Sequence, residues 1–372
     1  MTKLRVGITG YKGFIGYYLS IFIKHLANEL IFVPCPAGSF EDQTKLNHFV
    51  KKCDVIVHLA AKNKKFKNVF QTNVESVKKL VLALETELSP KHIIFSSSSQ
   101  KDKDNSYGRS KKKGQEILEN WSIKSNYTLS TLIIPNVFGA FCKPFHSSFI
   151  STFCYLLNNN QEPEIYDDEK ISFIYVENLV EIIVDLIRSK NFKNQIIKIK
   201  ADECLKVSDV LSKLILFKKS YLGSGAIPKL STNFDMDLFN TFRSYIDNSA
   251  LPKDLHLIND KEEHRFEIIK DNNGGNTSFS FTKPGTITGN YFHTRKIERF
   301  CIAYGDAIVR LRKLEDNKII ECKISGKNPK VIDLPIYHTH NIENIGKSNL
   351  LTIHWRTENY FQNESHTYFK KL

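Results

Sequence analysis

Short apolar runs alternate with longer amphipathic segments over the first part of the chain. Glycine, proline or polar residues bound the runs, and the segments between them carry apolar residues at helical spacing. We expect strands at Leu4–Thr9, Leu30–Val33, Asp54–Ala61 and Lys91–Phe95, and helices at Tyr17–Leu26 and Asn73–Glu87. Asp54–Ala61 is almost fully apolar, as a central parallel strand covered on both faces is. The alternation predicts an α/β domain with a doubly wound parallel sheet of the Rossmann type.

The pattern changes in the last third of the chain. Short segments of alternating polar and apolar residues follow one another between turn residues, without helical segments between them. We expect strands at Thr277–Phe281, Arg299–Ala303, Ala307–Arg312, Ile319–Ile324 and Leu350–Trp355, and a hairpin tip at Asp271–Asn276. Many short strands at close spacing predict an all-β sandwich or barrel. We therefore expect an α/β domain over residues 1–250 and a β domain over residues 251–372.

Length and composition are those of a globular protein with two domains. The 372 residues exceed the roughly 250–300 that one core usually supports. No apolar run approaches the roughly 18 residues of a membrane-spanning helix, and the N-terminus is a strand and not a signal peptide. The seven cysteines are scattered and form no C-x-x-C pair, which argues against a disulfide framework and a structural zinc site. We expect a cytoplasmic protein with no membrane span.

The net charge of +13 raises the question of nucleic-acid binding. The lysines are spread along the chain, and no basic stripe interleaved with stacking aromatic residues is visible. A cationic surface also attracts phosphorylated small substrates. We therefore expect no nucleic-acid partner and keep a nucleic-acid-binding protein as the least favoured alternative.

Three glycines, Gly10, Gly13 and Gly16, lie between the first strand and the first helix. A strand that breaks at glycines and continues as a helix directs backbone N–H groups and a helix N-terminus at one point, which suits a pyrophosphate. The loop therefore predicts a dinucleotide site. The end of the second strand carries Pro34, Cys35 and Pro36 and no acidic residue to hold an adenosine ribose, which favours NADPH or leaves NADH open.

Tyr107 and Lys111 are four residues apart on an expected helix and share one face of it. A nearby ammonium stabilises a phenolate, so we expect Lys111 to bring the pKa of Tyr107 toward neutrality for proton exchange with a carbonyl or alcohol oxygen. A serine from the preceding strand end could hydrogen-bond the same oxygen. Ser98 is the expected residue and Ser97 the alternative, because four adjacent serines leave the register open.

These features together resemble the extended short-chain dehydrogenase/reductases that act on nucleotide sugars. The resemblance rests on the glycine loop, the strand Asp54–Ala61, the serine cluster and Tyr107-Gly-Arg-Ser-Lys111. It implies that Tyr107 is the general acid, Lys111 its partner and Ser98 the supporting hydroxyl. The cofactor-binding residues that we expect are Gly10, Gly13, Phe14, Ile15, Gly16, Leu59, Ala60, Asn73, Lys111 and Pro135. The expected substrate-binding residues are Asn136, Phe138, Lys143 and His146.

Two segments of the β domain resemble the paired motifs of cupins. The first, Gly285 to Gly305, fits G-x5-H-x-H-x4-E-x6-G except that Tyr291 replaces the first histidine, and the second, Pro335 to Asn344, has Tyr337 where a glycine is usual. In cupins such residues converge on a divalent metal. The resemblance implies His293, Glu298 and His340 as ligands of a zinc ion, a set that can hold a metal with open positions, and His338 as a substitute.

A short-chain reductase followed by a cupin resembles the bifunctional capsular polysaccharide enzymes acting on UDP-2-acetamido-2,6-dideoxy-4-hexulose. That resemblance implies hydride delivery from NADPH to C4 and C3 epimerisation in the cupin, which the loss of one ligand position at Tyr291 puts in question. We expect a homodimer that makes a UDP-2-acetamido-2,6-dideoxy-L-hexose of L-talo or L-rhamno configuration for surface glycans. The alternative is a nucleotide-sugar 4,6-dehydratase or epimerase whose cupin is a non-catalytic dimerisation or sugar-binding module.

Overall fold

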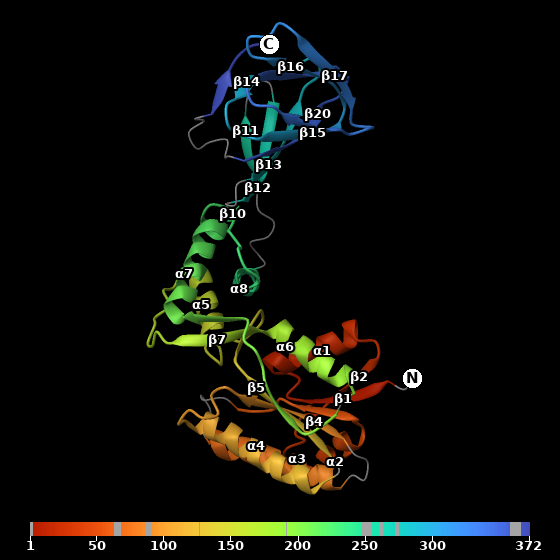
Figure 1. The fold of residues 1–372 in the computed structure, drawn as a ribbon, viewed down its shortest axis with the longest axis vertical. Coiled ribbons are helices and arrows are strands. Elements are labelled where there is room, and N and C mark those ends of the chain that lie inside the picture. The colour runs from red at the N-terminus through yellow and green to blue at the C-terminus, as the bar shows by residue number, and fades with distance from the viewer. Residues whose placement is uncertain are drawn as a thin grey trace. The chain divides into compact units, whose positions relative to one another are not determined.

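The chain folds into two compact units (Figure 1). This computed structural model describes residues 3–62, 68–86, 91–125, 127–190, 192–247, 255–259, 263–271, 275–357 and 366–372. The first unit comprises residues 1–215 and 230–246, and the second comprises residues 216–229 and 247–372. The boundary expected between residues 250 and 251 lies outside the described residues and stays a prediction.

A six-stranded sheet forms the centre of the first unit, in the order β2-β1-β3-β4-β5-β8. Every strand pair in it is parallel, and the order turns back between β1 and β3, so the sheet is doubly wound as the sequence predicts. The strands are β1 (Leu4–Thr9), β2 (Leu30–Pro34), β3 (Val55–His58), β4 (His92–Ser98), β5 (Thr128–Ile134) and β8 (Gln195–Lys198).

Helices cover both faces of this sheet (Figure 1). One apolar cluster joins the strands to α1 and α6, and a second joins them to α2, α3 and α4. The helices are α1 (Phe14–Leu26), α2 (Gln43–Lys51), α3 (Val69–Glu85), α4 (Ser106–Lys124), α5 (Phe149–Asn158), α6 (Val176–Arg188), α7 (Val207–Phe217) and α8 (Asn233–Arg243). Among the described helices, none is both long enough and apolar enough to cross a bilayer.

Two strand ends differ from the expected bounds. β3 is shorter than Asp54–Ala61, because Leu59 and Ala60 leave the ladder and donate their N–H groups to Oγ1 of Thr9, both at 3.2 Å. β4 is longer than Lys91–Phe95 and continues through Ser98, in parallel register with β5. Both differences occur at the carboxyl edge of the sheet, where doubly wound folds bind ligands.

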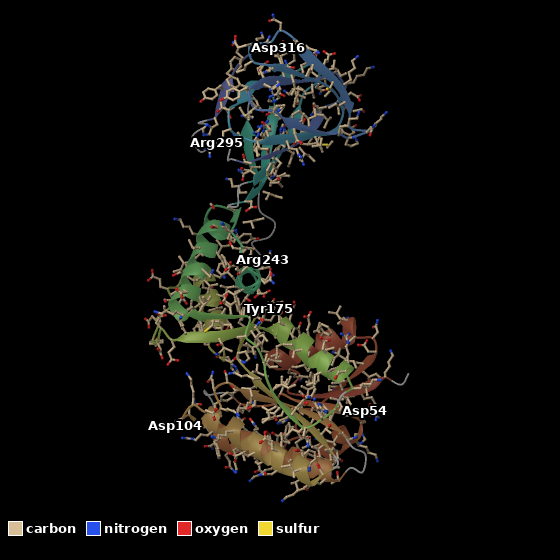
Figure 2. The ribbon with its side chains drawn as sticks, in the orientation of Figure 1. Asp54, Asp104, Tyr175, Arg243, Arg295 and Asp316 are labelled. Atoms are coloured by element: carbon tan, nitrogen blue, oxygen red, sulfur yellow. The ribbon has the colours of Figure 1, made fainter. Side chains whose placement is uncertain are left out.

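A small sheet of β6 (Asn136–Phe138), β7 (Lys170–Tyr175) and β9 (Glu203–Lys206) completes the first unit. Its core is aromatic: the Phe138 ring packs against the rings of Phe173, Tyr175 and Phe234, with centroids 6.2, 5.4 and 5.3 Å away. Tyr175 is labelled in Figure 2. This packing fixes the segment that follows β5.

The second unit contains two largely antiparallel sheets, in agreement with the expected cupin sandwich. One has the order β10-β12-β13-β20-β15-β18, with β11 paired to β12, and the other has the order β17-β16-β19-β14-β21. The π-helical turn η1 (Lys218–Gly223) and β10 (Ala226–Ile227) also belong to this unit, which the sequence did not predict. The strands are β11 (His256–Asn259), β12 (Glu263–Asp271), β13 (Gly275–Thr282), β14 (Ile287–His293), β15 (Glu298–Tyr304), β16 (Asp306–Lys313), β17 (Ile319–Ser325), β18 (Val331–Leu334), β19 (His338–Asn344), β20 (Leu350–Arg356) and β21 (Thr367–Phe369).

One unusual position of the cupin motifs has a structural explanation. Tyr337, where a glycine is usual, has a φ of 57°, in the left-handed region that favours glycine. Its N–H donates to the carbonyl of His293 at 2.7 Å, and its carbonyl accepts from the N–H of Leu314 at 2.9 Å. These bonds hold a tyrosine in a backbone conformation that is otherwise unfavourable.

The expected hairpin tip at Asp271–Asn276 lies partly outside the described residues, between β12 and β13.

Candidate active site

The glycine loop joins β1 to α1 and has the geometry of a phosphate cradle. Gly10 has a φ of +72°, and a Cβ there would lie 2.9 Å from the backbone nitrogen of Ala60. A Cβ on Gly16 would lie 2.3 Å from the carbonyl oxygen of Gly10, so the loop and the first turn of the helix touch backbone to backbone. The N-cap residue Gly13 has no side chain to cap α1. The helix N-terminus can therefore receive an anionic group through its backbone N–H groups.

Gly16→Ala is expected to abolish cofactor binding while the second unit stays folded. The added Cβ cannot coexist with the Gly10 carbonyl at 2.3 Å, so the loop must move and lose its N–H geometry. Titration of NADPH followed by its fluorescence measures the effect. Gly223→Ala is the matched control, because its Cβ would meet nothing closer than 4.0 Å. Unchanged NADPH affinity in Gly16→Ala would remove the loop from the cofactor site.

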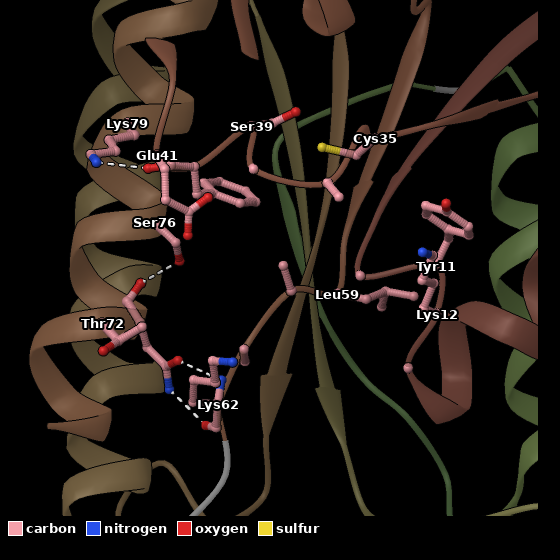
Figure 3. Close-up of a pocket in the computed structure, with 18 of the residues that line it drawn as sticks. Tyr11, Lys12, Cys35, Ser39, Glu41, Leu59, Lys62, Thr72, Ser76 and Lys79 are labelled. Carbon is pink, nitrogen blue, oxygen red and sulfur yellow. Dashed lines mark hydrogen bonds between the residues drawn. The ribbon is translucent and has the colours of Figure 1, made fainter. Parts of the chain in front are cut away.

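Two cavities meet at this loop. The larger, of about 600 Å³, lies along the loop after β2, the end of β3 and one face of α3 (Figure 3). The smaller, of about 360 Å³, lies over the ends of β4 and β5. Both are lined by Gly10, Gly13, Leu59, Ala61 and Lys62, so they form one path across the point where the strand order turns back. Such a path fits a dinucleotide with its pyrophosphate at the glycine loop.

Tyr107 and Lys111 line the smaller cavity from the first turns of α4. Lys111 is 5% exposed, and its Nζ donates to the carbonyl oxygen of Ser96 at 2.8 Å and lies 5.9 Å from the centre of the Tyr107 ring. The hydroxyl of Ser98 is hydrogen-bonded to Tyr107, whereas Oγ of Ser97 donates to Gln115 at 3.1 Å. Of the two candidate serines, Ser98 is therefore the one that meets the tyrosine.

The pKa values of this pair differ from the simple expectation. Burial lowers the pKa of Lys111 to about 8. Burial raises the pKa of Tyr107, and the hydrogen bond from Ser98 only partly opposes this. The expectation that Lys111 brings the pKa of Tyr107 toward neutrality is therefore wrong for this structure, because desolvation of the phenolate outweighs the hydrogen bond from Ser98, and the Lys111 ammonium lies 5.9 Å from the ring centre. Tyr107 is a phenol here, the form that can donate a proton.

Asn73 lies beside the path but binds protein groups. Its Oδ1 accepts from the N–H of Lys62 at 2.7 Å, and its Nδ2 donates to the carbonyl of Lys62 and to Oγ of Ser110, both at 3.0 Å. The bonds at Lys62 are drawn in Figure 3. Asn73 thus ties the segment after β3 to the turn of α4 that carries Lys111, which indicates a positioning role.

The expected substrate residues separate into two groups. Asn136 and His146 line the smaller cavity, and Oδ1 of Asn136 accepts from Nε2 of Gln100 at 3.2 Å. Phe138 is 1% exposed in the aromatic core of the small sheet, and the exposed Lys143 is not among the lining residues of either cavity. Gln100 also lines this cavity, and no feature of the sequence indicated it beyond its position after the serine cluster.

The remaining expected cofactor residues lie on the path. Phe14, Ile15, Gly16 and Pro135 line the smaller cavity, and Ala60 lines the larger one. Lys62 and Ser96 also line the cavities, but the sequence analysis did not predict them as site residues. Ser96 could have been found from strand alternation, because it shares a face with Ser98, two residues away.

In the second unit, the expected metal ligands are engaged with protein groups. Glu298 is fully buried and accepts from Nε2 of His293 at 2.8 Å and from Nε of Arg356 at 2.8 Å. Nδ1 of His340 donates to the carbonyl of Tyr291 at 3.1 Å, and Nδ1 of His338 donates to that of Ile336 at 2.9 Å. The described residues contain no group of three or more His, Cys, Asp or Glu side chains placed to hold a metal. The donor set does not fit the zinc that the resemblance implies.

Family comparisons cover most of the chain. Residues 6–199 match the NAD dependent epimerase/dehydratase family, and residues 259–368 match the polysaccharide biosynthesis C-terminal domain. A curated relative, the UDP-2-acetamido-2,6-beta-L-arabino-hexul-4-ose reductase of Pseudomonas aeruginosa, is 23% identical over 368 residues, which is 98% of each chain.

Solved structures give the same picture. The capsular polysaccharide assembling protein CapF of Staphylococcus aureus superposes with a TM-score of 0.87 at 30% identity, over 99% of this chain and 100% of that one. RMD from Pseudomonas aeruginosa, solved with NADPH, superposes with a TM-score of 0.56 at 15% identity, over 66% of this chain and 98% of that one. The second likeness concerns the fold alone.

Proposed function

Because the chain belongs to the NAD dependent epimerase/dehydratase family and, over its whole length, to the family of CapF, we propose that it reduces C4 of a UDP-2-acetamido-2,6-dideoxy-4-hexulose. Membership makes it an NAD(P)-dependent nucleotide-sugar oxidoreductase. The specific substrate is the proposal, and it is supported by the reductase of Pseudomonas aeruginosa, whose name states a hexul-4-ose. The observation that carries it is the Tyr107, Ser98 and Lys111 group in a cavity continuous with the dinucleotide path.

The side chains of the smaller cavity have the properties that carbonyl reduction requires. A bound reduced nicotinamide supplies the hydride. Tyr107, held as a phenol by burial, donates its proton to the oxygen at C4 as negative charge develops there, and Ser98 hydrogen-bonds the same oxygen. Lys111 is anchored by the Ser96 carbonyl, and its ammonium stabilises the phenolate that Tyr107 becomes. Asn136 and His146 also line this cavity and are the proposed contacts to the sugar.

NADPH is the proposed cofactor. The segment after β2, where NAD-binding folds place an acidic residue on the adenosine ribose, carries Cys35, Pro36 and Ala37 and lines the larger cavity. Lys12 and Lys62 line the same cavity and can attract a 2′-phosphate. NADH and NADPH oxidation compared at saturating sugar test this point, and a preference for NADH would contradict it.

The described residues that line the smaller cavity do not include the acid/base pair that a 4,6-dehydratase would need. Dehydration requires an additional acid/base pair beside the tyrosine, and none of the residues that line the smaller cavity in the described part of the chain is Asp or Glu. We therefore favour reduction. The two reactions separate in one assay: stoichiometric NADPH oxidation with the 4-hexulose supports reduction. Conversion of the UDP-N-acetylhexosamine precursor without net NADPH oxidation would support the alternative.

One further experiment determines both the configuration of the product and any proton exchange at C3. The reaction is run in deuterium oxide with the 4-hexulose generated in situ, and the product is analysed by NMR. The coupling of the C4 proton distinguishes the L-talo from the L-rhamno sugar. Deuterium at C3 would add an epimerase activity to the reductase, and its absence would leave the reductase alone.

The expected homodimer stays a prediction that light scattering of the purified protein tests.

Turnover is expected to fall as the pH rises through about 8. The lowered pKa of Lys111 means that its ammonium is lost above this value, whereas Tyr107, with its raised pKa, remains protonated there. The loss of the ammonium removes stabilisation of the developing phenolate, so the alkaline side of the kcat profile should follow one proton. Lys111→Met is expected to lower turnover and abolish this pH dependence.

Lys112→Met is the matched control for this experiment. Lys112 is the next residue on α4, is exposed and pairs with Asp102 at 3.5 Å on the surface. Its removal should leave both kcat and the profile unchanged. A wild-type rate that stays constant up to pH 10 would contradict the role given to Lys111.

A further inference from the structure

Glu298 and Arg356 face each other directly inside the second unit. Glu298 begins β15, Arg356 ends β20, and the two are register partners in the antiparallel pair of these strands. Both are buried, at 0% and 5% exposure. Directly opposed residues on one face of such a pair have Cβ atoms close enough for side-chain contact. The register therefore places a guanidinium beside the carboxylate that cupin metal sites use.

Both oxygens of the Glu298 carboxylate accept hydrogen bonds from buried side chains. Oε1 accepts from Nε and Nη2 of Arg356 at 2.8 and 2.5 Å and from Nδ1 of His354 at 3.2 Å. Oε2 accepts from Nε2 of His293 at 2.8 Å. The carboxylate is neutralised by a full positive charge and has four hydrogen bonds. A metal ion could bind Oε1 only by displacing donors that are already in place, and at Oε2 it would meet the carboxylate after Arg356 has neutralised its charge.

His293 and Tyr291 are also held by protein groups. The carboxylate can only accept, so Nε2 of His293 carries a proton. Its Nδ1 accepts from Oγ1 of Thr367 at 3.0 Å. Both nitrogens of this imidazole are therefore occupied. Tyr291, at the position of the missing histidine, accepts a hydrogen bond from Nη2 of Arg356 at 3.0 Å. The tyrosine that replaces a ligand and the arginine that supplies a charge thus contact each other.

We propose that Arg356 takes the place of the metal ion in this cupin. Its guanidinium supplies the positive charge that Glu298 requires, and Tyr291 hydrogen-bonds the guanidinium where a histidine would coordinate the metal. A divalent cation added to this site would meet a fixed cation instead of a bare carboxylate, and like charges at contact distance repel strongly in a buried setting. The second unit therefore folds and keeps its interior arrangement without a bound metal. This inference does not depend on the proposed reaction.

Metal analysis of the untagged full-length protein tests the proposal. The wild type is expected to purify with substoichiometric zinc, to show no saturable zinc binding by calorimetry, and to melt at the same temperature with chelator or with added zinc. One tightly held zinc per chain, whose removal lowers the melting temperature, would overturn the proposal.

A double substitution tests Arg356 itself. Tyr291→His with Arg356→Val returns an imidazole to the first ligand position and removes the internal cation. We expect this variant to bind one Co²⁺ per chain with the visible absorption of a low-coordinate site, and to gain thermal stability from the ion. A folded double variant that binds no Co²⁺ would overturn the role of Arg356 in excluding the metal.

Arg299→Val is the control for the loss of an arginine from the same sheet. Arg299 lies on β15 and pairs with Asp333 on the exposed surface, at 2.6 Å. Its removal should give neither Co²⁺ absorption nor a metal-dependent melting temperature. If the double variant does not fold, the wild-type zinc measurement alone decides between the two outcomes.

Discussion

Tyr107→Phe is expected to lower NADPH oxidation with the UDP-4-hexulose by about 10²–10⁴-fold, the usual contribution of a positioned general acid. The substitution removes the proposed proton donor and retains the ring that lines the smaller cavity beside Lys111. Because Tyr107 is a phenol in this environment, the proposed proton donor is present in the form that the reaction needs. Initial rates by absorbance at 340 nm, with NADPH affinity measured separately, give the effect on kcat. NADPH binding should be almost unchanged.

Tyr11→Phe is the matched control, because Tyr11 lines the larger cavity and not the smaller one. It should retain turnover close to that of the wild type, with any effect confined to the KM for NADPH. Retained reductase activity in Tyr107→Phe would remove the tyrosine from the reaction. Equal losses in both variants would indicate damage to the cofactor path instead of loss of the acid.

Arg356→Met is expected to destabilise the second unit by about 3–5 kcal/mol, because it leaves the buried charge of Glu298 without its partner. Although burial opposes its ionisation, the Arg356 guanidinium and hydrogen bonds from His293 and His354 hold the pKa of Glu298 well below its usual range. Glu298→Gln should destabilise the second unit by a similar amount, because it leaves the buried charge of Arg356 without its partner. The double variant should lose less than the sum of the two, since neither charge then remains buried alone.

The positions of the two tryptophans make this measurement specific to one unit. Trp121 lies in α4 of the first unit, and Trp355 precedes Arg356 in β20 of the second. In a Trp121→Phe background, the fluorescence of Trp355 therefore follows unfolding of the second unit by denaturant. Arg299→Met, which breaks only an exposed pair, should leave the stability of the second unit almost unchanged. If the stability losses of the Glu298 and Arg356 single variants add up to that of the double variant, this would contradict direct pairing of the two side chains.

The first unit was predictable because its signals are local. The turn from β1 to α1 has its glycines within seven consecutive positions. A Cβ on Gly16 would lie 2.3 Å from the Gly10 carbonyl oxygen of the same loop, and a Cβ on Gly10 would lie 2.9 Å from the backbone nitrogen of Ala60, after β3. The parallel order of the sheet likewise follows from alternating strands and helices. For the serine facing Tyr107, the sequence favoured Ser98 but left Ser97 as an alternative, because the choice depends on how far β4 extends, and β4 ends only at Ser98.

What the sequence did not predict depends on contacts between distant segments. Arg356 lies 58 residues from Glu298, and nothing in the pattern of β20 distinguishes a buried guanidinium from a solvated one until its register with β15 is known. Phe138 was expected at the substrate because of its position after Pro135, but β6 pairs with β7 and turns its ring into an aromatic core. The raised pKa of Tyr107 follows from its burial, which a four-residue spacing does not reveal.

Transfer of deuterium from NADPH labelled at C4 of its nicotinamide tests the central claim most directly. Each of the two stereospecifically labelled forms is supplied with the UDP-2-acetamido-2,6-dideoxy-4-hexulose, and the product is examined by NMR. We predict that one form places a single deuterium at C4 of the sugar, in step with NADPH oxidation, and that Tyr107→Phe abolishes both. A sugar that changes without acquiring deuterium from either form, while NADPH is not consumed, would contradict the assignment as a C4 reductase.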